Sequence, residues 1–273
     1  MTSPDTRPRN DPLRVERDDR DVVTLTLDRP EVKNAFDAAL IGRLRDTFIE
    51  LVSNASARVV VLTGSGDVFC AGADLSWMSG MRQASFDDNV EDSRGFEAML
   101  RAVQECPQPV VARVNGHALG GGAGLVACAD IVVTVAGARF GFTEVRLGLA
   151  PAVISPYVLP KIGAGAARHL FLTGERFDAA EAHRLGLVHR VTTPEDLDGA
   201  TAAVVDDLLA GGPQAQTQIK QLVPRVVDAG SPAAAVAITT DVIARLRVSD
   251  EGQEGMRAFF ERRAASWQTG GSS

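Results

Sequence analysis

The order of apolar runs and polar breaks along the chain predicts alternating strands and helices. Unbroken runs rich in Val and Ile occur at 22–27, 58–63, 110–114 and 131–135. Such runs are typical of strands buried on both faces of a parallel sheet. Apolar residues recur at helical spacing after Asp37, which we expect to cap a helix that ends near Val52. With further helices expected near 87–105 and 122–128, the rhythm predicts an α/β fold with right-handed crossovers.

The last third of the chain has a different pattern, because strand-like runs become rare after about Gly163. Asp178 is expected to cap a short helix closed by Gly186. Further helices are expected to begin at Pro194, Pro213, Pro232 and Asp250. These shifts predict four segments: a flexible lead over 1–11, a core over 12–195, a helical region over 196–267 and a disordered tail over 268–273.

Composition narrows the class of protein. The 273 residues include 28 Lys and Arg against 35 Asp and Glu, a net charge of −7, with 45% hydrophobic residues. This is an ordinary globular composition, and its acidic balance argues against nucleic acid or an anionic membrane as the main partner. No run of 18 apolar residues indicates a membrane span, and the polar start has no secretory pattern. We therefore expect a cytoplasmic protein.

Three cysteines at wide spacing exclude a disulfide scaffold and a cysteine-based zinc module. No two of the four histidines stand at metal-ligand spacing, so no metal site is expected. His117 is a weak candidate for lining a site, whereas His169 and His183 fit surface positions. Cys70 has no recognisable activating base and is expected to be a small buried thiol.

Two segments repeat one pattern, a buried strand followed by small residues: VVVLTGSGDVFCAGAD (59–74) and VVARVNGHALGGGAG (110–124). Glycines let backbone N–H groups approach a ligand, and a helix that begins there adds its positive dipole end. Two such turns at one sheet edge could direct two N–H groups at one oxygen, as in an oxyanion hole. Tight packing of a helix against a sheet explains the same glycines equally well.

Other known glycine motifs are either absent from the chain or lack the strand and helix context that their function requires. The G-x-G-x-x-A match that starts at Gly122 lies too far beyond its strand, and no acidic residue ends the strand near Val135. The chain contains no G-x-x-x-x-G-K-[ST] and no G-x-S-x-G motif. A dinucleotide-binding fold, a phosphate-binding loop and a hydrolase nucleophile elbow are therefore not supported.

Several motifs, in order over about residues 13–267, resemble the enoyl-CoA hydratase/isomerase (crotonase) superfamily. They are RPEVKNAF, GSGDVFCAGADLSWM, NGHALGGGAGLVACADIVV, ARFGFTEVRLGLAP, LTGERFDAAEAHRLGLVHRV and EGMRAFFERRAASW. Together with GGGAG, the segment EVRLGLAPAVISPYVLPKIG is most similar to the branch of methylglutaconyl-CoA and isohexenylglutaconyl-CoA hydratases. The resemblance implies an α/β fold with a crotonase-like ββα spiral core and a helical C-terminal region that serves trimerisation.

The resemblance also assigns binding roles. Matched by position, the N–H groups of Ala73 and Gly121 hold the thioester oxygen as it becomes an enolate. The positions implied to bind substrate or coenzyme A are Val32, Lys33, Ala35, Ala71, Gly72, Asp74, Leu75, His117, Gly120 and Gly124. Lys33 could meet a phosphate of coenzyme A, or be a solvated loop lysine. Coenzyme A arrives as part of the substrate, and no separate cofactor is implied.

One departure from the family pattern bears on the chemistry. Family hydratases commonly use two glutamates; the second is present here as Glu144, but the first position is Gly124. A lone glutamate could shuttle one proton between carbons, as in Δ3,Δ2-enoyl-CoA isomerases, or orient a water and return its proton. A loop residue such as Asp74 or Asp130 could also supply the missing base, although Asp130 fits a structural role better. Gly124 is further expected to free volume for a branched or carboxylated acyl chain.

The sequence therefore predicts an enoyl-CoA hydratase with Glu144, Ala73 and Gly121 as catalytic groups. The acyl chain is left open, and a branched or glutaconyl-type substrate is among the expected ones. An isomerase that uses Glu144 alone, or a non-catalytic protein that binds coenzyme A, is the alternative. Trp77, Met78 and Met81 are expected beside the acyl pocket or in ordinary helix packing. The expected partners are an acyl-CoA thioester and further copies of the chain, as a trimer or a dimer of trimers, with Met256, Phe259 and Phe260 suited to that packing.

Overall fold

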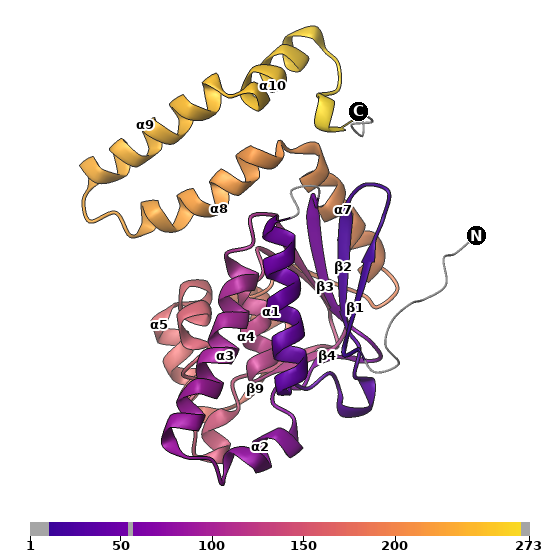
Figure 1. The fold of residues 1–273 in the computed structure, drawn as a ribbon, viewed down its shortest axis with the longest axis vertical. Helices are drawn as coiled ribbons and strands as arrows, with labels where there is room; N and C mark the ends of the chain where they lie inside the picture. The colour runs from indigo at the N-terminus through magenta and orange to yellow at the C-terminus, as the bar shows by residue number, and fades with distance from the viewer. Residues whose placement is uncertain (1–10, 54–56, 269–273) are drawn as a thin grey trace.

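Two sheets organise the structure, a computed structural model that describes residues 11–53 and 57–268 (Figure 1). In the larger sheet β1 is antiparallel to β2 and every other neighbour is parallel. In order across the sheet, its strands are β1 (Leu13–Arg17), β2 (Val22–Leu27), β3 (Val59–Gly64), β5 (Val110–Val114), β7 (Ile131–Val135) and β10 (Arg190–Thr192). The smaller sheet contains β4 (Val68–Cys70), β6 (His117–Leu119), β8 (Arg139–Gly141) and β9 (Arg176–Asp178).

The strands alternate between the two sheets. β3, β5 and β7 each join the larger sheet, and the next strand along the chain, β4, β6 or β8, joins the smaller one. Helical segments follow each pair before the chain returns to the larger sheet. The repeated turn is a ββα spiral, which confirms the expected α/β fold. The apolar runs of β3, β5 and β7 are buried almost throughout, as strands covered on both faces should be.

Side chains cap several of the helices. Asp37 Oδ1 accepts the N–H of Leu40 at 2.8 Å, and Ser85 with Asp88 forms a capping box. The helices are α1 (Ala38–Ser53), α2 (Leu75–Met81), α3 (Phe86–Gln104), α4 (Gly121–Cys128), α5 (Ser155–Thr173), α6 (Ala179–Arg184), α7 (Leu197–Ala210), α8 (Pro213–Val227), α9 (Pro232–Val248) and α10 (Asp250–Glu261). Short 3₁₀ turns cover Pro30–Val32, Glu144–Leu147 and Ser266–Gln268.

The C-terminal helices divide into two groups. Helix α7 packs against β3, β5 and β7 and buries Val204 and Val205, so it belongs with the sheets; it begins at Leu197 rather than Pro194. Helices α8, α9 and α10 extend away from the sheets (Figure 1). The division between 195 and 196 stays a prediction. The lead and the tail fall largely on 1–10 and 269–273, outside the described residues.

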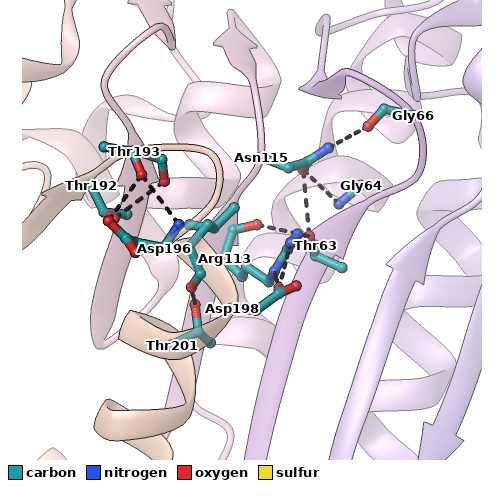
Figure 2. A network of polar contacts seen from close by, with 11 residues as sticks. Thr63, Gly64, Gly66, Arg113, Asn115, Thr192, Thr193, Asp196, Asp198 and Thr201 are labelled. Atoms are coloured by element: carbon teal, nitrogen blue, oxygen red, sulfur yellow. Dashed lines mark hydrogen bonds and ion pairs between the residues drawn. The ribbon is translucent and has the colours of Figure 1, made fainter.

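A polar network joins the ends of β3 and β5 to the start of α7 (Figure 2). Arg113 of β5 pairs with Asp198 of α7 at 2.6 Å. Asn115, which follows β5, accepts the N–H of Gly64 at 3.2 Å and donates to the carbonyl of Gly66 at 2.9 Å. These bonds fix the turn after β3, and with it the strand β4 that leads into the candidate site. Within the described ranges, no helix is long and apolar enough to cross a membrane.

Candidate active site

Two cavities meet beside the turn that joins β4 to α2. Their volumes are ≈ 540 Å³ and ≈ 520 Å³, and both are lined by Ala71, Ala73 and Leu75. The two therefore form one groove in two parts with a shared neck. We call the first the outer cavity and the second the inner cavity.

The outer cavity gathers most of the positions that the sequence assigns to coenzyme A. Its lining includes Val32, Lys33, Ala35, Ala71, Asp74, Leu75 and His117. Arg176 of β9 also lines it, although no sequence pattern pointed to this residue. Lys33 and Arg176 are exposed and bring two basic side chains to the cavity, beside the carboxyl groups of Glu31 and Asp74, and basic side chains are the partners that phosphate groups prefer.

A buried asparagine holds the segment that carries Lys33. Asn34 is fully buried, and its side-chain amide donates to the carbonyls of Ser65 and Val68 at 2.9 and 2.8 Å. Lys33 and Asn34 both have positive φ, at 56° and 55°, a left-handed conformation that asparagine tolerates better than most residues. The loop is thus tied to the start of the smaller sheet, and Lys33 is left facing the outer cavity.

The first candidate donor is the N–H of Ala73. Phe36 and Ala73 form an isolated parallel bridge: the N–H of Phe36 donates to Gly72 at 2.7 Å, and the N–H of Asp74 donates to Phe36 at 2.8 Å. The bridge uses the neighbours of Ala73 and leaves its own N–H unused among the described residues. Ala73 is exposed and lies at the neck, so this N–H is available to a bound molecule.

The second candidate donor is the N–H of Gly121, the first residue of α4. The first N–H groups of a helix have no acceptor within it. A Cβ added to Gly72 would lie 3.7 Å from this nitrogen, so the two glycine turns lie against each other. Gly72 and Gly120 have positive φ, at 94° and 51°, which a side chain would disfavour. The two N–H groups can therefore serve one oxygen at the neck.

The glycines of α4 are also required for packing. A Cβ at Gly121 would lie 2.9 Å from Phe96, and a Cβ at Gly122 would lie 2.9 Å from the Cβ of Cys70. The glycines therefore serve both purposes that the sequence left open. They let backbone N–H groups approach a ligand, and they allow tight packing of the helix against the sheet. Cys70 is buried as predicted, and burial raises the pKa of its thiol to about 12, so it is not a nucleophile.

Glu144 stands beside the two donors. A Cβ added to Gly120 would lie 3.4 Å from Glu144 Oε1. Its other carboxyl oxygen, Oε2, is buried and has no hydrogen-bond partner among the described residues. Burial raises the pKa of this carboxyl, against a smaller opposite effect of its own backbone N–H. An unpartnered carboxyl with a raised pKa in a cavity is typical of a group that exchanges protons with a ligand.

Neither alternative loop base is free to act. Asp74 Oδ1 accepts from the backbone N–H and hydroxyl of Ser76 at 2.8 and 2.6 Å, and Oδ2 accepts from Arg29 at 3.1 Å. The hydrogen bonds from Ser76, together with Arg29, lower the pKa of Asp74. Asp130 Oδ2 accepts from Lys220 at 2.6 Å and from the N–H of Val110 at 2.7 Å. Asp74 lines the outer cavity and caps α2, and Asp130 is structural, as expected.

Gly124 does not open the cavity as the sequence predicted. It is buried, and it is absent from the described lining of both cavities. A Cβ at this position would lie 2.7 Å from the Cβ of Ile154 and closer still to its Cγ2. Ile154, which lies just before α5, therefore fills the space that was expected for an acyl branch. The two residues are 30 positions apart, so no local pattern could have indicated the contact.

The inner cavity is mostly apolar. Trp77, Met78 and Met81 line it as one of the two sequence readings expected. Of its described lining residues, only Glu144 and Asp92 are ionisable. Asp92 lies on α3, and burial raises its pKa while a hydrogen bond with the Trp77 side chain opposes that shift. Sequence analysis missed Asp92, since its helix shows an ordinary amphipathic pattern.

Comparisons with known proteins identify the family of the chain. The family profile described as "Enoyl-CoA hydratase/isomerase" matches residues 17–270. A crotonyl-CoA hydratase of Syntrophomonas wolfei is 30% identical over 252 residues, which are 90% of this chain and 94% of that protein. A crystal structure of an enoyl-CoA hydratase from Shewanella pealeana superimposes with a TM-score of 0.90 at 37% identity, covering 94% of this chain and 96% of that one. Pseudomonas aeruginosa AtuE also superimposes with a TM-score of 0.90, at 35% identity over 94% of this chain and 99% of its own.

Proposed function

Because the chain belongs to the enoyl-CoA hydratase/isomerase family, we propose that it adds water across the 2,3-double bond of an acyl-CoA thioester. The coenzyme A part lies in the outer cavity, where Lys33 and Arg176 can meet its phosphates. The acyl chain enters the inner cavity, and the thioester sits at the neck. The names of the relatives described above support this assignment.

The neck supplies the electrostatic part of the reaction. When the thioester carbonyl points at the N–H groups of Ala73 and Gly121, both donate to its oxygen. Attack at Cβ moves charge onto this oxygen, and donors already in place stabilise the resulting enolate. Removal of one such donor typically lowers kcat by about 10²–10³.

Glu144 performs the proton transfers. Its carboxylate takes a proton from a water molecule as the water oxygen bonds to Cβ, which leaves an enolate and a neutral carboxyl. The carboxyl then gives the proton to Cα, and the thioester and the carboxylate are restored. The net result is addition of one water. The single observation that carries the proposal is the buried, unpartnered Oε2 of Glu144 beside the two donor turns.

The inner cavity favours an uncharged acyl chain over a glutaconyl-type one. Its described lining contains no Lys, Arg or His, and the additional carboxyl of Asp92 would repel a second carboxylate. The methionines and Trp77 provide an adaptable apolar wall. We therefore expect straight or modestly branched neutral chains to react faster than dicarboxylic ones.

The test is an assay of product mass with wild type and the variant Glu144→Gln. Wild type should add 18 mass units to crotonyl-CoA, as expected for addition of one water. The variant should lose about 10²–10⁴ of kcat, the usual contribution of general acid–base catalysis. Arg184→Lys, which keeps the charge of an exposed side chain outside the described lining of both cavities, is the control and should keep wild-type turnover.

Other outcomes contradict the proposal in distinct ways. Conversion of a 3-enoyl-CoA to its 2-isomer, with no mass change and no hydration of crotonyl-CoA, would identify an isomerase. Binding of acyl-CoA without turnover of any substrate in a panel of straight, branched and glutaconyl-type thioesters would identify a non-catalytic binding protein. Unchanged turnover in Glu144→Gln would remove Glu144 from the chemistry.

Two further proposals concern the setting of the reaction. The three cysteines are free and buried, which suits a reducing compartment, and we place the enzyme in the cytoplasm. Large apolar side chains of α10 are open to solvent, Phe259 and Phe260 at 79% each. We expect further copies of the chain to cover them, as a trimer or a dimer of trimers.

A further inference from the structure

We infer that Ile154 determines acyl-chain specificity, because it forms a matched pair with Gly124 that places hydrocarbon beside the reacting carbons. The inference rests on the proposed function and adds a residue and a substrate preference to it. It concerns the wall of the inner cavity next to Glu144.

The evidence for the pair is the packing of Ile154 against Gly124. Ile154 is 2% exposed, yet it lines the inner cavity, so it lies between α4 and the cavity. An added Cβ at Gly124 would lie 2.7 Å from Ile154 Cβ, a separation that real Cβ atoms essentially never show. Isoleucine is stiff at χ1, and its Cβ is fixed by the backbone, so rotation cannot relieve the contact. Any side chain at 124 must displace Ile154.

The position of this pair relative to Glu144 follows from α4. The N–H of Gly124 donates to the carbonyl of Gly120 at 3.1 Å, so the two glycines lie one turn apart. Glu144 stands against Gly120, and Ile154 stands against Gly124. Glu144 and Ile154 both line the inner cavity. Ile154 thus belongs to the same cavity wall as Glu144, beside the next turn of the chain.

The consequence concerns the substrate. Glu144 must reach both Cα and Cβ, so a substituent on Cβ lies close to Ile154. With its present volume, Ile154 favours substrates whose Cβ carries no branch. It also excludes the side chain of a second glutamate from position 124. The wall therefore selects acyl chains without a branch at Cβ and keeps a second glutamate out of position 124, so that Glu144 and Asp92 are the carboxyl groups of the described cavity lining.

The experiment measures binding of two saturated thioesters, butyryl-CoA and 3-methylbutyryl-CoA, by calorimetry. Wild type should prefer butyryl-CoA. Ile154→Ala should shift the ratio of the two dissociation constants toward the branched ligand by about tenfold or more, since one methyl group in a pocket is worth 10–200-fold. Val158→Ala is the matched control, because Val158 is buried one turn further along α5 and is absent from the described lining of both cavities. Its ratio should stay near that of wild type.

A double-mutant cycle of melting temperatures tests the contact between Gly124 and Ile154 separately from ligand preference. Gly124→Glu alone should lower Tm sharply, and the same substitution in an Ile154→Gly background, which removes the Cβ at 154, should lower it much less, because contacting residues are not additive. Additive Tm changes, or an equal shift of the binding ratio in both alanine variants, would overturn the inference. Wild type that binds both thioesters but does not hydrate crotonyl-CoA would contradict the proposed function alone, and wild type that binds neither thioester would contradict both.

Discussion

At the scale of single residues, the side chain that we propose as the acid–base group also destabilises the fold. Burial raises the pKa of Glu144 above its usual 4.5, so the folded protein binds its proton more readily than the unfolded chain does. Ionised Glu144 therefore reduces stability. This cost is absent below about pH 4.5 and grows as the pH rises through the folded pKa.

Glu144→Gln should accordingly raise Tm at pH 7.5 and have little effect at pH 4. An unsatisfied buried group costs about 1–3 kcal/mol, and each kcal/mol corresponds to roughly 2–4 °C in a protein of this size. Calorimetric scans at the two pH values measure the difference. Equal Tm values of wild type and variant at pH 7.5 would show that the ionised carboxyl does not destabilise the fold.

A second residue-scale prediction separates the two carboxyl groups of the inner cavity. Asp92 lies on α3, and its carboxyl is hydrogen-bonded to the Trp77 side chain. Glu144 Oε2, in contrast, has no hydrogen-bond partner among the described residues. Asp92→Asn should keep kcat on crotonyl-CoA within roughly tenfold of wild type, well short of the 10²–10⁴ expected for Glu144→Gln. Steady-state kinetics decide this. Losses of equal size in the two variants would assign Asp92 to the chemistry.

Sequence reasoning at this scale finds residues that belong to a motif and misses residues that act by contact. Glu144, Ala73 and Gly121 could be singled out because their neighbours in sequence form motifs, and the structure brings the three to one cavity, while their catalytic roles stay a prediction. Ile154 could not, because its role is to meet Gly124 across the fold. Gly124 was accordingly misread as free volume.

At the scale of elements, the turn between β4 and α2 is held so that the N–H of Ala73 stays in place. Asp74 caps α2 and binds Arg29, which also donates to the carbonyl of Ala35 at 2.6 Å. Arg29 is mostly buried, with 18% of its side chain exposed, and it also pairs with Asp37 at 3.0 Å. One guanidinium thus joins the segment that carries Lys33 to the segment that carries the donor.

Asp74→Ala should lower both Tm and kcat/KM. Loss of a cap costs about 0.5–2 kcal/mol, and the donor at Ala73 loses its support. Ser85→Ala is the control, since it removes the capping box of α3 on the protein surface. It should lower Tm to a similar extent and leave kcat/KM unchanged. Equal kinetic losses in both variants would mean that Asp74 acts only through general stability.

The elements themselves were predictable in proportion to their length. The runs 22–27, 110–114 and 131–135 are strands with the expected bounds, because five or six buried apolar residues leave few alternatives. The strands β4, β6, β8 and β9 have three residues each and carry no recognisable pattern. Their pairing is set by the spiral rather than by their own composition, and the same holds for β10.

At the scale of the whole molecule, helices α8–α10 leave large apolar side chains uncovered. Val227, Val248, Phe259 and Phe260 each have more than three quarters of their surface exposed. Patches of this kind normally mark an interface. The sequence suggested assembly through this region by resemblance, and the exposure gives that proposal a physical reason.

The double variant Phe259→Asp/Phe260→Asp should convert the predicted trimer or hexamer to smaller species. Light scattering coupled to gel filtration measures the mass. Ile49→Asp, which places a charge on an exposed apolar residue of α1, is the control and should keep the assembly. A wild-type mass equal to one chain of 28.8 kDa would contradict the proposed assembly.

The central claim is that two backbone donors hold the thioester oxygen beside a single working carboxyl. A crystal structure with bound butyryl-CoA tests it most directly. The account predicts the carbonyl oxygen within about 2.7–3.1 Å of the nitrogens of both Ala73 and Gly121, with Glu144 facing Cα and Cβ. A carbonyl oxygen directed away from both nitrogens would contradict it.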